Sequence, residues 1–158
     1  MIARKFHKFF NLGERDETQP HWIDWSHPHL RLVKTNGSLM TPMLRADRVR
    51  WASKMGVTRV SQPVEALVEG RDNYLQVARN AHCRGVTALF EWCSSQAQCV
   101  ILHDPESALV LLAVRDNPSG RYWPQDEVED FARDHGVPCI ARDGGRAVVG
   151  PRPTTRPI

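Results

Sequence analysis

The chain has 158 residues, the size of one domain and too short for a two-domain enzyme. Hydrophobic residues make up 41% and charged residues 25%, which is typical of a globular domain and excludes a disordered or fibrous protein. The longest apolar run, Ala108 to Val114, is far shorter than the ~18 residues of a membrane-spanning helix, so we expect no membrane partner. Four cysteines without CxxC spacing favour a reduced, cytoplasmic protein.

The net charge of +3 is unevenly distributed. Residues 144–158 contain three Arg, three Pro, three Gly and no acid, so we expect a folded domain at 1–143 and a disordered basic tail at 144–158. Within the domain, residues 45–59 contain five cations against Asp47, whereas residues 104–134 are acidic. This separation is compatible with a basic face for phosphates or with an ordinary solvated surface.

The first half of the chain predicts strands followed by helices. Residues 30–34 and 39–44 are two apolar runs on either side of Asn36-Gly37, which predicts a hairpin. Val49 and Trp51 alternate with arginines, as in a strand with one buried face. Residues 64–81 have helical apolar spacing, and Gly70 divides them into two helices.

The second half predicts more strands and one helix. Strands are expected at 86–92, 98–103 and 108–115, followed by a turn at 117–120. Pro124 begins a helix with acids in its first turn and Gly136 after its end, and 137–141 predicts a last short strand. Because the connections between strands are too short for parallel crossovers, the fold class is α+β, with a mostly antiparallel sheet and flanking helices.

Three local features could carry chemistry. Lys34 ends an apolar run before a glycine turn, where partial desolvation would make its amine a nucleophile, although a solvated hairpin lysine fits the pattern as well. Glu91 interrupts an apolar strand and needs a polar partner if it is buried, but it could also face solvent at the strand end. Lys8-Phe9-Phe10 could stack on a base beside a phosphate, or anchor the core.

Taken in order, five segments resemble the adenylyltransferase domain of the phage-type RNA ligase 1 family, incomplete at both ends. The resemblance covers roughly residues 3–142. Its segments are Ala3 to Glu14, Lys34-Thr35-Asn36-Gly37-Ser38-Leu39, Ser53 to Thr58, Phe90-Glu91-Trp92, and Leu111 to Gly120. The resemblance implies a nucleotidyltransferase (ATP-grasp-like) core that uses ATP and Mg²⁺. In that family a lysine in a KxDGS motif forms a lysyl-AMP intermediate, and the adenylate passes to an RNA 5′-phosphate for joining to a 3′-hydroxyl.

The resemblance also implies a role for each matching residue. Lys34 corresponds to the nucleophile and Asn36 to the acid of KxDGS, within the nucleotide site. Glu91 corresponds to the glutamate on the ribose and metal side, and is the expected metal ligand. Lys54 lies in a segment that supplies a phosphate-contacting lysine, and Lys8 and Phe10 lie in the segment that helps form the nucleotide pocket.

The chain departs from the family pattern at several points. Asn36 replaces a carboxylate, so we expect reduced or lost activity. A later EGxV-like glutamate and a KxK-like lysine pair are not found in the sequence. Two alternatives to an active RNA ligase therefore stay open. The chain is a catalytically inactive RNA- or protein-binding module derived from a ligase, or it is one part of a split ligase completed by a second polypeptide. A phage-encoded protein would act in the host cytoplasm.

Overall fold

The computed structural model describes residues 3–46, 48–93 and 109–143. Two compact units are present. Unit 1 consists of Met1–Phe6 and Lys34–Ile140, and unit 2 consists of His7–Val33 and Ala141–Ile158. Among the helices of the described ranges, none is long and apolar enough to cross a membrane. The predicted strand at 98–103 and the predicted tail at 144–158 lie outside the described residues.

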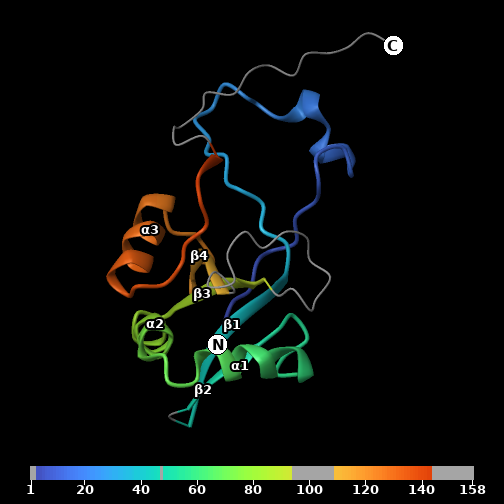
Figure 1. Ribbon diagram of the computed structural model, residues 1–158. Coiled ribbons are helices and arrows are strands. Elements are labelled where there is room, and N and C mark those ends of the chain that lie inside the picture. The colour runs from blue at the N-terminus through green and yellow to red at the C-terminus, as the bar shows by residue number, and fades with distance from the viewer. Residues whose placement is uncertain (1–2, 47, 94–108, 144–158) are drawn as a thin grey trace. The chain divides into compact units, whose positions relative to one another are not determined.

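Unit 1 is built on a four-stranded sheet in which all neighbouring strands are antiparallel (Figure 1). The strands, in the spatial order β2-β1-β3-β4, are β1 (Ser38–Arg45), β2 (Arg48–Ala52), β3 (Val86–Trp92) and β4 (Leu109–Asp116). The first five residues of β3 are all buried, as expected for an apolar run in a central strand. The predicted α+β class with an antiparallel sheet is confirmed.

Three α-helices cover one face of this sheet. They are α1 (Gln62–Val68), α2 (Asp72–Cys83) and α3 (Gln125–Asp134), and a 3-10 turn, η3 (Arg59–Ser61), precedes α1. Gly70, with a φ of +75°, separates α1 from α2, which confirms the predicted division. Pro124 precedes α3 as its N-cap and Gly136, at a φ of +60°, follows its end, again as predicted.

The core lies between this helical layer and the sheet. Trp51, Tyr74 and Phe90 form an aromatic cluster, with ring centroids 5.4 Å apart for Trp51–Phe90 and 6.0 Å apart for Tyr74–Phe90. The Tyr74 hydroxyl donates a hydrogen bond to the Leu109 carbonyl at 3.2 Å, and burial raises the pKa of that hydroxyl. The core side chains from α3 are Val128, Phe131 and Ala132.

The opposite face of the sheet receives the first described residues of the chain. The Arg4 N–H donates to Thr87 Oγ1 at 2.8 Å, and Phe6 stacks on Tyr122 with centroids 5.7 Å apart. The Arg115 guanidinium donates to the carbonyls of Lys5 and Gly120. Residues 3–6 are therefore held to β3 and β4 by backbone and ring contacts.

Two predicted elements are wrong. Residues 30–34 do not form a hairpin with 39–44. The partner of β1 in the hairpin is β2, and Leu32 forms a single antiparallel bridge with Arg142. The predicted strand at 137–141 is reduced to one parallel bridge between Leu111 and Cys139. Both runs are short, so long-range pairing rather than local pattern decides their conformation.

The described residues of unit 2, 7–33 and 141–143, form short elements. These are two 3-10 turns, η1 (Asp16–Thr18) and η2 (Pro20–Trp22), together with the bridge between Leu32 and Arg142. Beside that bridge, the Val33 N–H donates to the Ala141 carbonyl at 2.9 Å. An ion pair of 2.8 Å between Arg31 and Asp143 lies on the same pair of segments.

Candidate functional site

The candidate site lies where β1 begins and β3 ends. In the antiparallel register Ser38 pairs with Trp92 and Leu39 pairs with Glu91. The residues just before β1 therefore lie beside the end of β3. This register brings together Lys34, Asn36, Gly37 and Glu91, which we call the Lys34 cluster.

Gly37 makes the closest approach within the Lys34 cluster. A Cβ atom at this position would lie 2.1 Å from the carbonyl oxygen of Trp92 and 2.7 Å from its carbonyl carbon. Any other residue would force the two backbones apart. The Gly37 N–H also donates a hydrogen bond to the Glu91 carboxylate. A glycine here is thus required by space, and it fixes the segment that carries Lys34 against β3.

Glu91 is half-buried, on the face of β3 that also carries Thr87. Burial raises the pKa of the Glu91 carboxyl, while the Gly37 N–H and the positive charge of Lys34 act in the opposite direction. The carboxyl therefore has the polar partners that a buried acid needs, while part of it remains exposed near the end of β3. Its partners are a backbone donor and a lysine charge.

Lys34 itself is exposed, which corrects the expectation of a desolvated amine. The residues before it do not form the predicted strand, so no neighbouring strand covers its stem. The Lys34 ammonium donates a hydrogen bond to Asn36 Oδ1. The amide oxygen accepts this bond in the place where a carboxylate was expected, so the side chain is oriented without a neutralising charge.

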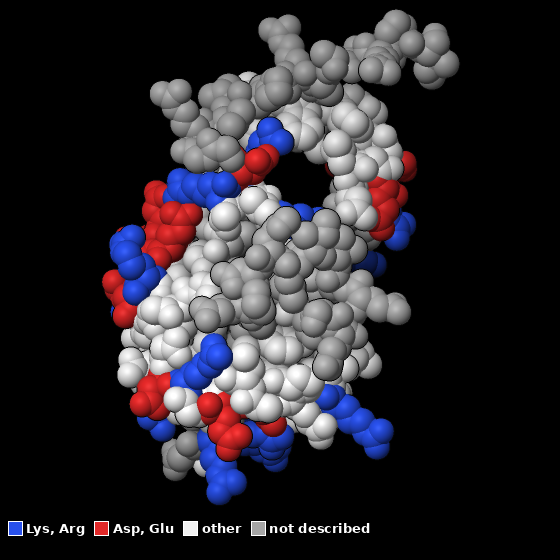
Figure 2. Space-filling model, viewed as in Figure 1, with Lys and Arg blue, Asp and Glu red and all other residues white. Residues whose placement is uncertain are grey.

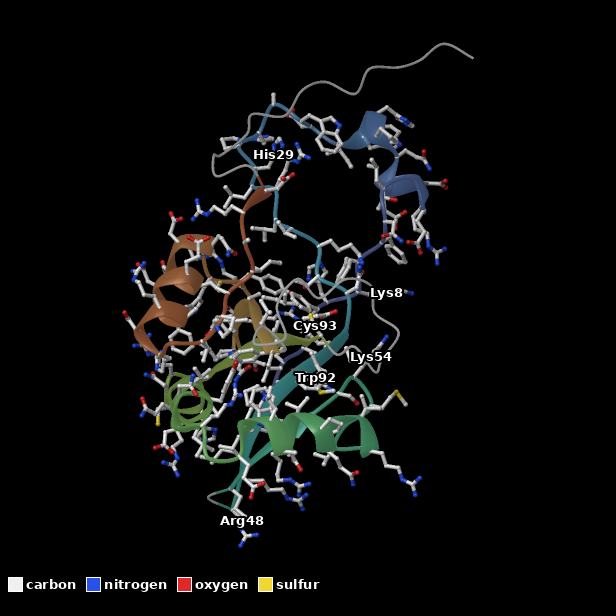
Figure 3. All side chains as sticks on the ribbon, in the orientation of Figure 1. Lys8, His29, Arg48, Lys54, Trp92 and Cys93 are labelled. Atoms are coloured by element: carbon white, nitrogen blue, oxygen red, sulfur yellow. The ribbon has the colours of Figure 1, made fainter. Side chains whose placement is uncertain are left out.

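Lys54 is presented by a tight turn after β2 (Figure 3). Ser53 and Gly56 exchange two backbone hydrogen bonds of 2.9 and 3.0 Å, and Gly56 has a φ of +102°. The Met55 N–H adds a bond to Ser53 Oγ at 3.2 Å. The turn is therefore well braced, and Lys54 projects from it with its side chain exposed.

Lys5 is a cation near this turn that the sequence reasoning did not single out. Its ammonium donates to the carbonyl of Ser53, and burial lowers its pKa. The basic N-terminal stretch is the sequence feature that could have pointed to Lys5. Its contact with Ser53, however, depends on residues 3–6 packing against the sheet. Lys5 is partly buried and places a second amine next to the turn that presents Lys54.

Lys8 and Phe10 belong to unit 2 and form a cluster there. The Lys8 ammonium lies 5.0 Å from the Phe10 ring centroid and the Arg15 guanidinium lies 4.8 Å from it. Phe9 is 69% exposed and Phe10 is partly exposed, so the reading of this segment as a core anchor is wrong. The ring of Phe10 is instead a cation-binding surface.

A magnesium ion fits the Lys34 cluster by the chemistry of its donors. Mg²⁺ takes oxygen ligands, and it is held in proteins by one or two carboxylates together with water and substrate phosphates. Glu91 offers one carboxylate and Asn36 offers one amide oxygen. In residues 3–46, 48–93 and 109–143, no three His, Cys, Asp or Glu side chains gather into a metal-binding group. The donors of the Lys34 cluster could therefore hold a metal only with help from a phosphate.

The comparisons with known proteins point to one family. The profile of a family described as RNA ligase matches residues 1–143. The Thermovibrio ammonificans protein named "Putative RNA ligase" is 35% identical over 123 residues, which cover 77% of this chain and 32% of that protein. The chain thus spans about a third of the length of this curated relative.

Solved structures agree on the fold. An apo mutant of the Naegleria gruberi RNA ligase matches with a TM-score of 0.55 and 14% identity, covering 70% of this chain and 34% of that one. An archaeal ATP-dependent RNA ligase matches with a TM-score of 0.53 and 14% identity over 72% of this chain and 30% of that one. A lysine-to-alanine mutant of the Naegleria gruberi RNA ligase, solved with ATP and Mn, matches with a TM-score of 0.53 at 15% identity, over 70% of this chain and 35% of that one. The family profile covers most of the chain, and by this match the chain belongs to the RNA ligase family.

Proposed function

We propose that this chain is the nucleotidyltransferase part of an ATP-dependent RNA ligase, with Lys34 as the residue that becomes adenylylated. The observation that carries the proposal is the Lys34 cluster. An exposed lysine, a glycine turn and a half-buried glutamate meet where β1 begins and β3 ends. The RNA ligase family and the fold of ATP-dependent RNA ligases agree with this chemistry.

In the first step the neutral amine of Lys34 attacks the α-phosphorus of ATP. A nitrogen–phosphorus bond forms, the bond from the α-phosphorus to the bridging oxygen breaks, and pyrophosphate leaves with that electron pair. The proton lost by the lysine passes to water or to a carboxylate. The adenylyl group then moves to an RNA 5′-phosphate, and an RNA 3′-hydroxyl displaces AMP to join the ends.

Glu91 supports this step by its position and by its charge. Its carboxylate would hold the ribose or a Mg²⁺ ion, with the amide oxygen of Asn36 as a second donor. The bound metal ion would neutralise charge that develops on the phosphates. The hydrogen bond from Gly37 keeps the carboxylate in place and favours its ionised form.

Cations outside the Lys34 cluster would receive the phosphates. Lys54 on its braced turn is the proposed contact, and the ammonium of Lys5, which donates to the Ser53 carbonyl, lies beside the same turn. Lys8 and Phe10 are proposed nucleotide-binding residues, as the family resemblance implies. A mutant of the Naegleria RNA ligase that matches this fold was solved with ATP and Mn.

Asn36 sets the expected level of activity. A carboxylate at this position could both orient the lysine and bind the metal ion or its water, whereas the amide offers only a neutral oxygen. We therefore expect slow self-adenylylation. A protein that binds ATP and RNA without turnover is the alternative that this residue favours.

The test is incubation with ATP labelled on the α-phosphate, in the presence of Mg²⁺. The expected product is an acid-labile, base-stable adduct on the protein, weak in the wild type and absent in Lys34→Ala. Lys54→Ala is the matched control, since it removes another exposed lysine of unit 1 and should reduce the adduct without abolishing it. Strong labelling that survives Lys34→Ala would overturn the assignment.

A further inference from the structure

The β1–β2 hairpin ends in two arginines that face one another. Arg45 is the last residue of β1, Arg48 is the first residue of β2, and the register places them directly opposite. Both side chains are exposed. Like charges directly opposite in an antiparallel pair destabilise the pairing, so this arrangement has a cost that a bound anion would remove.

The next arginine along β2, Arg50, does have a carboxylate partner. Arg50 Nε lies 2.7 Å from Glu65 Oε1, in an ion pair that ties β2 to α1. For Arg45 and Arg48, the described part of the chain contains no carboxylate within ion-pair distance. Asp47, between them in the sequence, lies outside the described residues. Figure 3 shows the Arg48 side chain pointing away from unit 1 at the tip of the hairpin.

The first residue after β1 has an unusual backbone angle. Ala46 has a φ of +46°, in the left-handed region that a non-glycine residue adopts only in tight turns. Only residues 46 and 47 separate the two strands, so the Cα atoms of the arginines are held at the spacing of a cross-strand pair. The two guanidinium groups therefore originate side by side.

The opposite charge gathers elsewhere in unit 1. Helix α3 contains five acidic residues and one arginine within Gln125–Asp134. Figure 2 shows acidic side chains along the side of unit 1 that α3 occupies in Figure 1, and basic side chains projecting, among some acidic ones, where the hairpin lies. A polyanion approaching unit 1 is repelled from α3 and attracted to the hairpin tip.

We propose that Arg45 and Arg48 bind the phosphate backbone of the RNA substrate, at a distance from the joined end. This inference rests on the proposed function, because it assumes an RNA whose 5′-phosphate reaches Lys34. Seven residue steps along β1 separate Arg45 at the tip from Ser38 beside the Lys34 cluster, roughly 23 Å at ~3.3 Å per step. Arginine suits this role, since its planar guanidinium binds phosphate oxygens in pairs. Because this contact involves the phosphates and not the bases, we expect it to be independent of the RNA sequence.

The experiment measures binding of a fluorescent, 5′-phosphorylated single-stranded RNA of 20 nucleotides across a series of salt concentrations. For R45Q/R48Q, the slope of log affinity against log salt should become shallower by roughly 1.4, from ~0.7 for each lost phosphate contact on a single strand. R71Q/R79Q is the matched control, because it removes two exposed arginines from the region of α2. The control should leave the slope within about 0.3 of the wild-type value, well below the loss of one contact.

Two further variants separate RNA binding from protection of the sheet edge. Because β2 is an edge strand of the sheet formed by the described residues, the arginines of this hairpin could serve only to prevent aggregation, and glutamates would do so equally well. R45E/R48E should bind RNA more weakly than R45Q/R48Q, whereas R45K/R48K should keep most of the slope. Equal slopes in the wild type, the Gln variant and the Glu variant would overturn the inference, as would binding lost equally in the α2 control.

Labelling with ATP in the absence of RNA tests the proposed function separately from RNA binding by the hairpin. R45Q/R48Q should form the Lys34 adduct at the wild-type rate, because that step needs no RNA. A wild type that binds RNA through the hairpin but forms no adduct would contradict the proposed function and leave the inference standing. A variant that forms the adduct and keeps the full salt slope would contradict the inference alone.

Discussion

Neighbouring residues of β3 point to opposite faces of the sheet, and the two faces have different environments. Phe90 packs between Trp51 and Tyr74 on the helix-covered face and is fully buried. Glu91, the next residue, lies on the opposite face with Gly37 and Lys34 as its partners. Because side chains alternate along a strand, one face of β3 carries core residues and the other carries candidate site residues. Substitutions on the first face should mainly lower the free energy of unfolding, and substitutions on the second should mainly change formation of the Lys34 adduct.

The largest effect on stability is expected for Phe90→Ala. Removing a fully buried ring from the aromatic cluster leaves a cavity, and such changes cost about 3–5 kcal/mol. Denaturant unfolding followed by tryptophan fluorescence would measure this loss. A loss below about 1 kcal/mol would place Phe90 outside the main core and undo the contrast between the two faces.

Gly37→Ala should come next. The new Cβ would meet the Trp92 carbonyl at 2.1 Å, so β1 and β3 must separate where they first pair. We expect a destabilisation of about 1–3 kcal/mol, together with a weaker Lys34 adduct. Ser38→Ala, one residue along, is the control because it adds no atom against Trp92. Equal unfolding free energies for the two variants would show that the close approach is not present in solution.

Glu91→Gln should change how the free energy of unfolding varies with pH. A carboxyl whose pKa is raised by folding keeps its proton to a higher pH in the folded state than in the unfolded state. The wild type therefore loses stability as the pH rises from the ordinary glutamate value of 4.5 through the raised value. The variant lacks this loss, so its unfolding free energy should gain on that of the wild type across the same window.

Adduct formation should respond to Glu91→Gln in the opposite sense. At neutral pH we expect the variant to form the Lys34 adduct about ten to a hundred times more slowly, as is typical when a group that orients a metal or its ligands is lost. An unchanged rate, with normal unfolding, would remove Glu91 from the site.

The smallest effect on stability is expected for Asn36→Asp. Asn36 is exposed, so the unfolding free energy should change by less than about 0.5 kcal/mol. The restored carboxylate should nevertheless raise the rate of adduct formation, because it can accept the lysine hydrogen bond and bind a metal ion as well. A rate equal to that of the wild type would show that the amide is not the limiting defect.

The strands and helices of unit 1 were predictable because their patterns are strong and local. The apolar run at Val86–Trp92, the alternation at Arg48–Trp51, and the start and stop signals of α3 each determine an element without help from distant residues. Residues 30–34 failed because a short apolar run takes its partner from the tertiary structure, here Arg142 rather than residues 39–44.

For the candidate site, the sequence supplied the residues to examine but not how they lie relative to one another. Lys34, Asn36 and Glu91 were identified from the family resemblance, and the register of β1 with β3 shows how they meet. The exposure of Lys34 and the contact of Lys5 with Ser53 depend on folding of the segments that flank the sheet. No local pattern encodes such contacts, since each joins residues far apart in the chain.

The central claim is that Lys34 carries the adenylyl group, and peptide mapping tests it most directly. Wild-type protein and Asn36→Asp would be incubated with ATP and Mg²⁺, digested with trypsin and analysed by tandem mass spectrometry. A modified Lys34 blocks cleavage, so the account predicts one adenylyl group on an uncut peptide running from Leu32 to Arg45. An adenylyl group on another lysine, or none on either protein, would contradict it.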